Sequence, residues 1–69
     1  MSAGALRLHP LDLWVLPQEG PLLPQLRQAL LQCAEQRLGP GAEPLRWAIT
    51  AVDPWQGLRL EGVLVGTER

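Results

Sequence analysis

The stretch from Trp47 to Val65, WAITAVDPWQGLRLEGVLV, constrains this chain more than any other part because it has the pattern of a β-hairpin. Two segments rich in β-formers, 46–52 and 58–65, flank a turn sequence. Asp53 suits the first position of a type I turn, and Pro54 suits the second because its φ is already fixed there. Gly57 can adopt the left-handed conformation that closes a four-residue loop.

This turn predicts a register that begins with Asp53 opposite Leu58. On the face expected to be core, the predicted pairs are Ala51 with Leu60, Ile49 with Gly62, and Trp47 with Leu64. On the other face they are Val52 with Arg59, Thr50 with Glu61, Ala48 with Val63, and Arg46 with Val65. We expect Gly62 to leave room for the helix, and the second face to be polar near the turn and apolar near Val63 and Val65.

Residues 22–38 are predicted to form a helix, because strong helix formers fill the segment and Gly39-Pro40 follows it. Glutamines and Glu35 form a polar stripe, while leucines, alanines and Cys33 cover a much wider arc than a surface helix needs. The surplus is covered either by the N-terminal segment or by a partner. Cys33 is expected to be a buried structural thiol.

Period-two alternation of apolar residues predicts a first strand at about 11–16. Leu6 and Leu8 continue the pattern, but Pro10 makes that part an edge, a bulge or no strand. Residues 1–5 are expected to be a frayed tail. Trp14 faces the side opposite to Leu11 and Leu13, where it is either covered by the N-terminal tail or displayed on the open face.

The order β-α-β-β predicts a single small α+β domain over residues 1–69, with one helix on one face of a three-stranded, mostly antiparallel sheet. We favour the strand order 1-3-2 over 1-2-3. The other sheet face would stay open. A chain of 69 residues buries little surface, so oligomerisation or a larger partner is expected to support it.

Composition narrows the classes of function. The net charge is −1 and the six basic residues, all arginine, are scattered, which makes a nucleic-acid footprint unexpected. No apolar run approaches the roughly 20 residues of a membrane span. The N-terminus lacks the pattern of a signal peptide, and with one cysteine the chain is expected to be cytoplasmic.

No arrangement of residues predicts catalysis. His9 and Asp12 are close in sequence, but no nucleophile accompanies them, and an exposed histidine at a strand start is the simpler interpretation. One His and one Cys do not form a metal site. We therefore expect no enzyme activity, no catalytic residues, no cofactor and no metal.

The leading hypothesis is a protein-interaction module or accessory subunit, with a homodimer as one form of it. The candidate partner-binding residues are Trp55, Trp14, Arg46, Arg59, Val63 and Val65. Trp55 either caps the end of the core or anchors a partner, because Trp and Arg are enriched at interface hot spots. Trp47 is expected to be core. The alternative is a nucleic-acid-associated regulator that uses Arg46, Arg59 and Trp55.

The segments PLRWAITAVD and LRLEGVLV resemble the C-terminal hairpin of a family of short uncharacterised cyanobacterial proteins, in which a helix precedes it. The resemblance covers about residues 24–65 and excludes HPLDLWVLP. It implies no activity and no functional residues, because none is assigned in that family.

Overall fold

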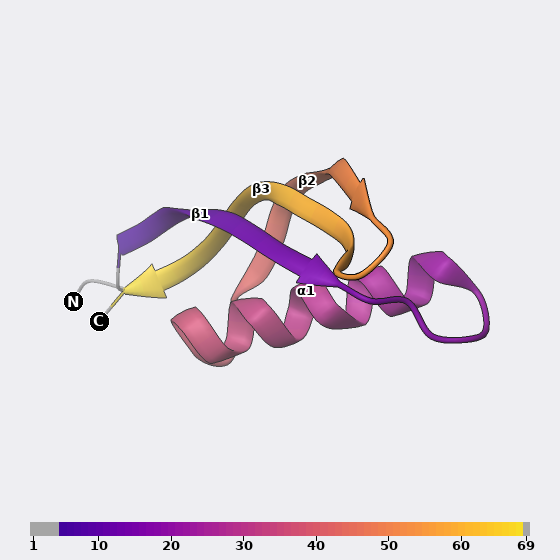
Figure 1. The fold of residues 1–69 in the computed structure, drawn as a ribbon. Helices are drawn as coiled ribbons and strands as arrows, with labels where there is room; N and C mark the ends of the chain where they lie inside the picture. Colours follow the sequence, from indigo (N-terminus) through magenta and orange to yellow (C-terminus); the bar gives the residue numbers. More distant parts are fainter. Residues whose placement is uncertain (1–4, 69) are drawn as a thin grey trace.

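The computed structural model describes residues 5–68 as a three-stranded sheet with one helix (Figure 1). The elements are strand β1 (Ala5–Val15), helix α1 (Leu22–Leu38), strand β2 (Glu43–Asp53) and strand β3 (Gly57–Glu68). The strand order is β1-β3-β2, and β3 is antiparallel to both neighbours. This confirms the predicted α+β fold and the preferred order 1-3-2. Helix α1 lies along one face of the sheet, and no helix within residues 5–68 covers the opposite face (Figure 1).

Strand β1 is longer than the predicted strand at 11–16. It pairs with β3 continuously from Ala5 to Val15, with Pro10 opposite Val63. Because β1 is an edge strand, a residue without a backbone N–H can be tolerated there. The expectation of a frayed tail is therefore wrong at Ala5, and residues 1–4 lie outside the described residues.

Helix α1 has the predicted bounds, Leu22–Leu38. Gly39, with φ of +90°, ends it, and its N–H donates to the carbonyl of Glu35 at 2.8 Å. No side chain caps the first turn. Instead, the Gln25 amide accepts a hydrogen bond from the N–H of Gln18 at 2.6 Å and donates to the carbonyls of Gln18 and Pro21 at 2.9 and 3.0 Å. Gln25 thus fastens the incoming loop to the helix.

A small cluster of aliphatic side chains between α1 and the sheet forms the core. Its buried members are Leu11, Leu26, Leu30, Ala34, Ala42, Leu60 and Leu64. Trp47 and Cys33 are partly buried and pack against this cluster. Cys33, predicted to be a buried thiol, is therefore only half-buried. Three leucines of the wide apolar arc, Leu22, Leu23 and Leu31, remain exposed, so the N-terminal segment does not cover them.

The hairpin forms as predicted, but its turn and register differ. Asp53 lies opposite Gly57, so the loop is Pro54, Trp55 and Gln56. The Oδ1 of Asp53 accepts hydrogen bonds from the N–H groups of Trp55 and Gln56 at 2.7 and 2.9 Å. Gly57, with φ of +94°, is the first residue of β3 and has the left-handed conformation that closes the turn. The predicted four-residue loop is therefore wrong by one residue.

Two irregularities in β2 increase this difference along the hairpin. The register shifts between Ile49 and Ala51, and again between Pro44 and Arg46. Trp47 consequently lies opposite Gly62 instead of Leu64, and Arg46 lies opposite Val63 instead of Val65. The shorter loop displaces the pairing by one residue, and the irregularity between Ile49 and Ala51 displaces it by another. Because side chains alternate with period two, a displacement of two residues leaves Trp47 on the predicted core face and Arg46 on the open face.

Gly62 has a different role from the one predicted. A Cβ atom at this position would collide with the carbonyl oxygen of Arg46 and lie 2.7 Å from the Cα of Trp47. The glycine therefore permits a close approach of strand β2, and not of the helix. The glycine beside the helix is Gly66, where a Cβ would lie 3.0 Å from a methyl carbon of Leu38.

Candidate functional site

The candidate site is the sheet face that points away from α1, which we call the open face. Residues paired across a sheet share a face, and Leu11, Leu60 and Leu64 mark the buried one. The open face therefore carries Leu6, Leu8, Pro10, Asp12 and Trp14 from β1, Arg59, Glu61, Val63 and Val65 from β3, and Glu43, Arg46, Ala48 and Thr50 from β2.

Charged and polar side chains occupy the part of the open face nearest the hairpin turn. Arg59 on β3 makes a two-pronged interaction with Asp12 on β1, with nitrogen–oxygen distances of 2.6 and 2.9 Å. Its Nε also lies 3.1 Å from Oε1 of Glu61, which accepts a hydrogen bond from Thr50 at 3.1 Å. This row, the polar half, joins all three strands.

The ion pair changes the protonation of its members. The hydrogen bonds from Arg59, reinforced by its positive charge, lower the pKa of Asp12 below its usual 3.8 against a smaller opposing effect of burial. Hydrogen bonding and the charges of Asp12 and Glu61 raise the pKa of Arg59. Both partners therefore stay charged over the ordinary pH range. Their side chains remain 39% and 52% exposed, so the pair is a surface feature.

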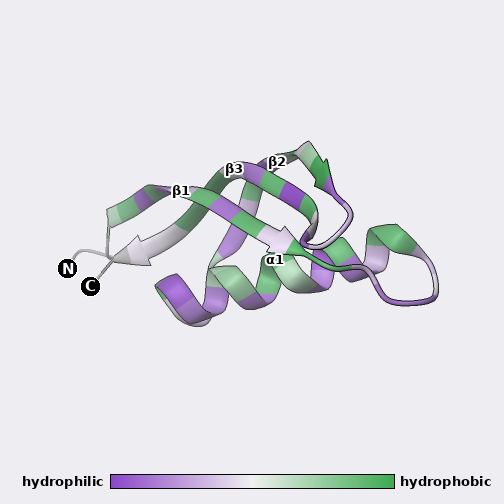
Figure 2. Cartoon of the chain, in the orientation of Figure 1, coloured by the Kyte–Doolittle hydropathy of each residue, from purple (hydrophilic) through white to green (hydrophobic). Residues whose placement is uncertain are grey.

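The other part of the open face, the apolar half, is formed by Leu6, Leu8, Pro10, Val63 and Val65. Leu8 lies opposite Val65, and Pro10 opposite Val63. Leu6 is 74% exposed and Leu8 is 65% exposed, while the two valines are partly buried. In Figure 2, β3 alternates between hydrophilic and hydrophobic residues near the hairpin turn and is hydrophobic along its middle. Large aliphatic side chains thus lie in solvent next to one another.

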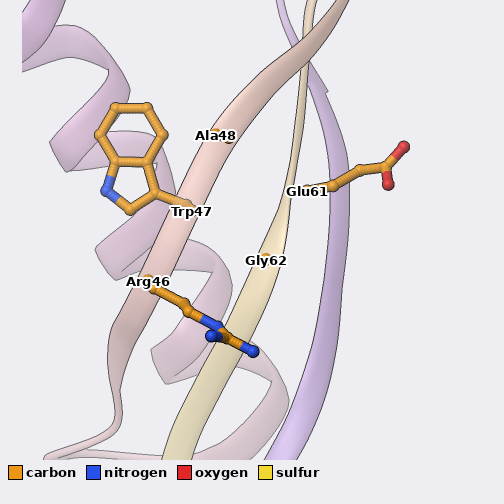
Figure 3. Close-up of a pocket in the computed structure, with 5 residues that line it drawn as sticks. All are labelled: Arg46, Trp47, Ala48, Glu61 and Gly62. Carbon is orange, nitrogen blue, oxygen red and sulfur yellow. The ribbon is translucent and has the colours of Figure 1, made fainter.

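A shallow hollow of about 210 Å³ lies beside strands β2 and β3 and is lined by Arg46, Trp47, Ala48, Glu61 and Gly62 (Figure 3). The ring of Trp47 extends toward α1, and the side chains of Arg46 and Glu61 extend the other way (Figure 3). Within residues 5–68, no three potential metal ligands lie together, and no helix is long and apolar enough to cross a membrane.

The structure brings most of the predicted partner-binding residues together. Trp14 lies opposite Arg59 beside the polar half and is 37% exposed. Arg46 lies opposite Val63 at the border of the apolar half. Trp55 is separate from them, in the hairpin turn, and is 87% exposed, so it does not cap the end of the core.

The sequence prediction missed two parts of this surface. The first is the pair Leu6 and Leu8, whose alternation was visible but seemed interrupted by Pro10. The second is the link between Asp12 and Arg59, which are 47 residues apart. The preferred strand order already indicated that the first and third strands are neighbours. Only the register between them shows that Asp12 and Arg59 meet.

One family model matches the chain. It is described as a domain of unknown function (DUF8621), and it matches residues 11–66, most of the sheet and the whole helix. The match includes the second half of β1, which the sequence resemblance left out. No curated protein and no solved structure matches the chain significantly.

Proposed function

We propose that this chain, which belongs to the family of that domain of unknown function, is a small protein-interaction module whose open face carries the contacts. The observation that supports this best is the exposure of adjacent large aliphatic side chains, with Leu6 at 74% and Leu8 at 65%. A contiguous apolar patch with a polar border is typical of a binding surface. The role is non-enzymatic: the module contributes a surface, as a self-associating protein or as an accessory subunit.

The polar half suits the border of such a surface. Arg59 is held in place by Asp12 and Glu61, and Trp14 lies opposite it. A fixed guanidinium beside an aromatic ring is the kind of group that orients a partner, whereas the apolar half supplies the area. We include Trp55 as a separate anchor, because a tryptophan that is 87% exposed in a turn contributes little to the core.

The alternative, a nucleic-acid-associated regulator, is less favoured. It relies on Arg46, Arg59 and Trp55 for contacts with phosphates and bases. Arg59 already contacts two carboxylates, so a phosphate would compete with Asp12 and Glu61 for the same guanidinium. Retention on a polyanion column at low salt would favour this alternative.

The cellular setting is also a proposal. A single free cysteine is typical of a cytoplasmic protein, and we place the module in the cytoplasm. The resemblance of the hairpin to short cyanobacterial proteins leads us to propose such an origin.

The proposal is tested by affinity capture from the native cell extract, comparing the wild-type chain with a Leu8→Glu variant. A Leu31→Glu variant is the matched control, because Leu31 is 41% exposed on helix α1. We expect the wild type and the control to retain the same proteins, and the Leu8→Glu variant to lose them. Identical sets from all three baits would contradict a role for the open face.

A further inference from the structure

We propose that the apolar half of the open face is covered by the apolar half of a second copy of this chain, related to the first by a two-fold axis. This inference rests on the proposed function and names its partner. In the dimer, Leu6, Leu8, Pro10, Val63 and Val65 of one copy would pack on the same residues of the other, with a helix on each outer side.

The amount of exposed surface agrees with such a dimer. The chain has an accessible surface of 5190 Å², whereas a compact monomer of 7.6 kDa is expected to expose about 4,300 Å². The difference of about 900 Å² and the radius of gyration of 13.3 Å, against about 11 Å expected, reflect an elongated molecule with extents of 49 × 20 × 15 Å. Such a molecule leaves more surface in solvent than a compact one, and a second copy packed on one long face would cover part of it.

The edges of the sheet are less suited to association than its face. Strand β2 carries Pro44 and two bulges, which interrupt regular pairing with an added strand. On β1, the carbonyl of Pro10 already accepts a hydrogen bond from Arg37 at 2.7 Å, and Pro10 has no N–H to donate. Both edges are therefore obstructed, and face-to-face packing leaves them unchanged.

The charges at the border of the apolar half allow two copies to meet. Glu43 lies opposite Val65 and Arg46 lies opposite Val63, both on strand β2. Neither forms an ion pair with another residue that the structure describes. A two-fold axis can place the Arg46 of each copy near the Glu43 of the other, so that opposite charges meet at the rim.

Sedimentation equilibrium of the purified chain tests the proposal. We expect the wild type to approach twice 7.6 kDa, or 15.2 kDa, at micromolar concentrations. Leu8→Glu should raise the dimer dissociation constant by at least about tenfold, because it places a charge in the apolar contact. Leu31→Glu should leave the constant unchanged. Circular dichroism shows whether each variant folds, and the 65% exposure of Leu8 favours a folded monomer.

A charge exchange provides a second test that does not alter the apolar contact. Glu43→Arg and Arg46→Glu should each weaken the dimer, because like charges then meet across the axis. The double variant should recover the affinity of the wild type. A double variant weaker than both single variants would overturn the two-fold arrangement.

The failure of this inference can be separated from the failure of the proposed function. A wild-type chain that stays at 7.6 kDa at all concentrations, yet captures a different protein through Leu8, would overturn the dimer and leave the interaction module standing. A monomer whose captured proteins are the same with and without Leu8→Glu would overturn both.

Discussion

At the scale of single residues, Arg59 organises the polar half of the open face. It lies on the central strand and reaches a carboxylate on the edge strand β1 and a second one two positions along its own strand. Period two places the side chains of Arg59 and Glu61 on the same face, and the register of β1 places Asp12 beside them. The contacts of Arg59 with these two carboxylates thus depend on both the alternation of side chains and the strand order.

The ion pair predicts a pH dependence for an Asp12→Asn variant. Because the folded state lowers the pKa of Asp12 below 3.8, its stabilising contribution is present above pH 3.8 and is lost as the pH falls through the lowered value. Asp12→Asn should therefore have a lower urea midpoint than the wild type near neutral pH, and the same midpoint well below pH 3.8. Glu35→Gln, on the exposed polar side of helix α1, is the control and should show no such difference from the wild type. If the urea midpoint of Asp12→Asn stays below that of the wild type at low pH, the ion pair is not the cause of the difference.

Gly57 combines a left-handed backbone with a close contact. A Cβ atom there would collide with the carbonyl oxygen of Val15 and lie 2.7 Å from the Cα of Leu16. Gly41, with φ of +88°, has a similar backbone and open space around it. We expect Gly57→Ala to lower the free energy of unfolding by about 2 kcal/mol or more, and Gly41→Ala by about 1 kcal/mol. Urea denaturation measures both, and equal losses would show that the contact with β1 is unimportant.

At the scale of elements, helix α1 could be predicted fully, whereas the hairpin could be predicted only in part. The helix bounds follow from local signals, since helix formers end at a glycine and a proline. The register depends on bulges near Thr50 and Leu45, which no local signal identifies. These bulges accompany the close approach of β2 to β3 at Gly62, which is a tertiary property. The faces of Trp47 and Arg46 were predicted correctly because two of the shifts cancel in the pleat.

The loop between β1 and α1 provides a prediction at this scale. Gln25→Ala removes three hydrogen bonds to Gln18 and Pro21, so it should lower the free energy of unfolding by about 1 kcal/mol and speed amide exchange at Gln18. Gln28→Ala is the matched control on the exposed side of the same helix and should be neutral. Denaturation and hydrogen exchange measure the two effects. A Gln25→Ala variant as stable as the control would mean that the loop is held by other contacts.

At the scale of the whole molecule, the fold, the open face and its apolar part near Val63 and Val65 could be predicted from the sequence, but the contribution of β1 to the apolar patch could not. The α+β class and strand order followed from the order of the elements and the handedness of crossovers. The patch depends on Leu6 and Leu8, whose strand continues past Pro10 only because β1 is an edge. A single sequence does not show whether a proline lies at an edge until the sheet is assembled.

The proposed contact of two copies of the chain through the apolar half of the open face can be followed by a nuclear magnetic resonance dilution series. Backbone amide spectra of the wild-type chain are recorded from millimolar to micromolar concentration. We expect the amide shifts of Leu6, Leu8, Val63 and Val65 to change on dilution, while those of Leu31 on the outer helix stay constant. Spectra that do not change with concentration, or changes centred on Leu31, would contradict it.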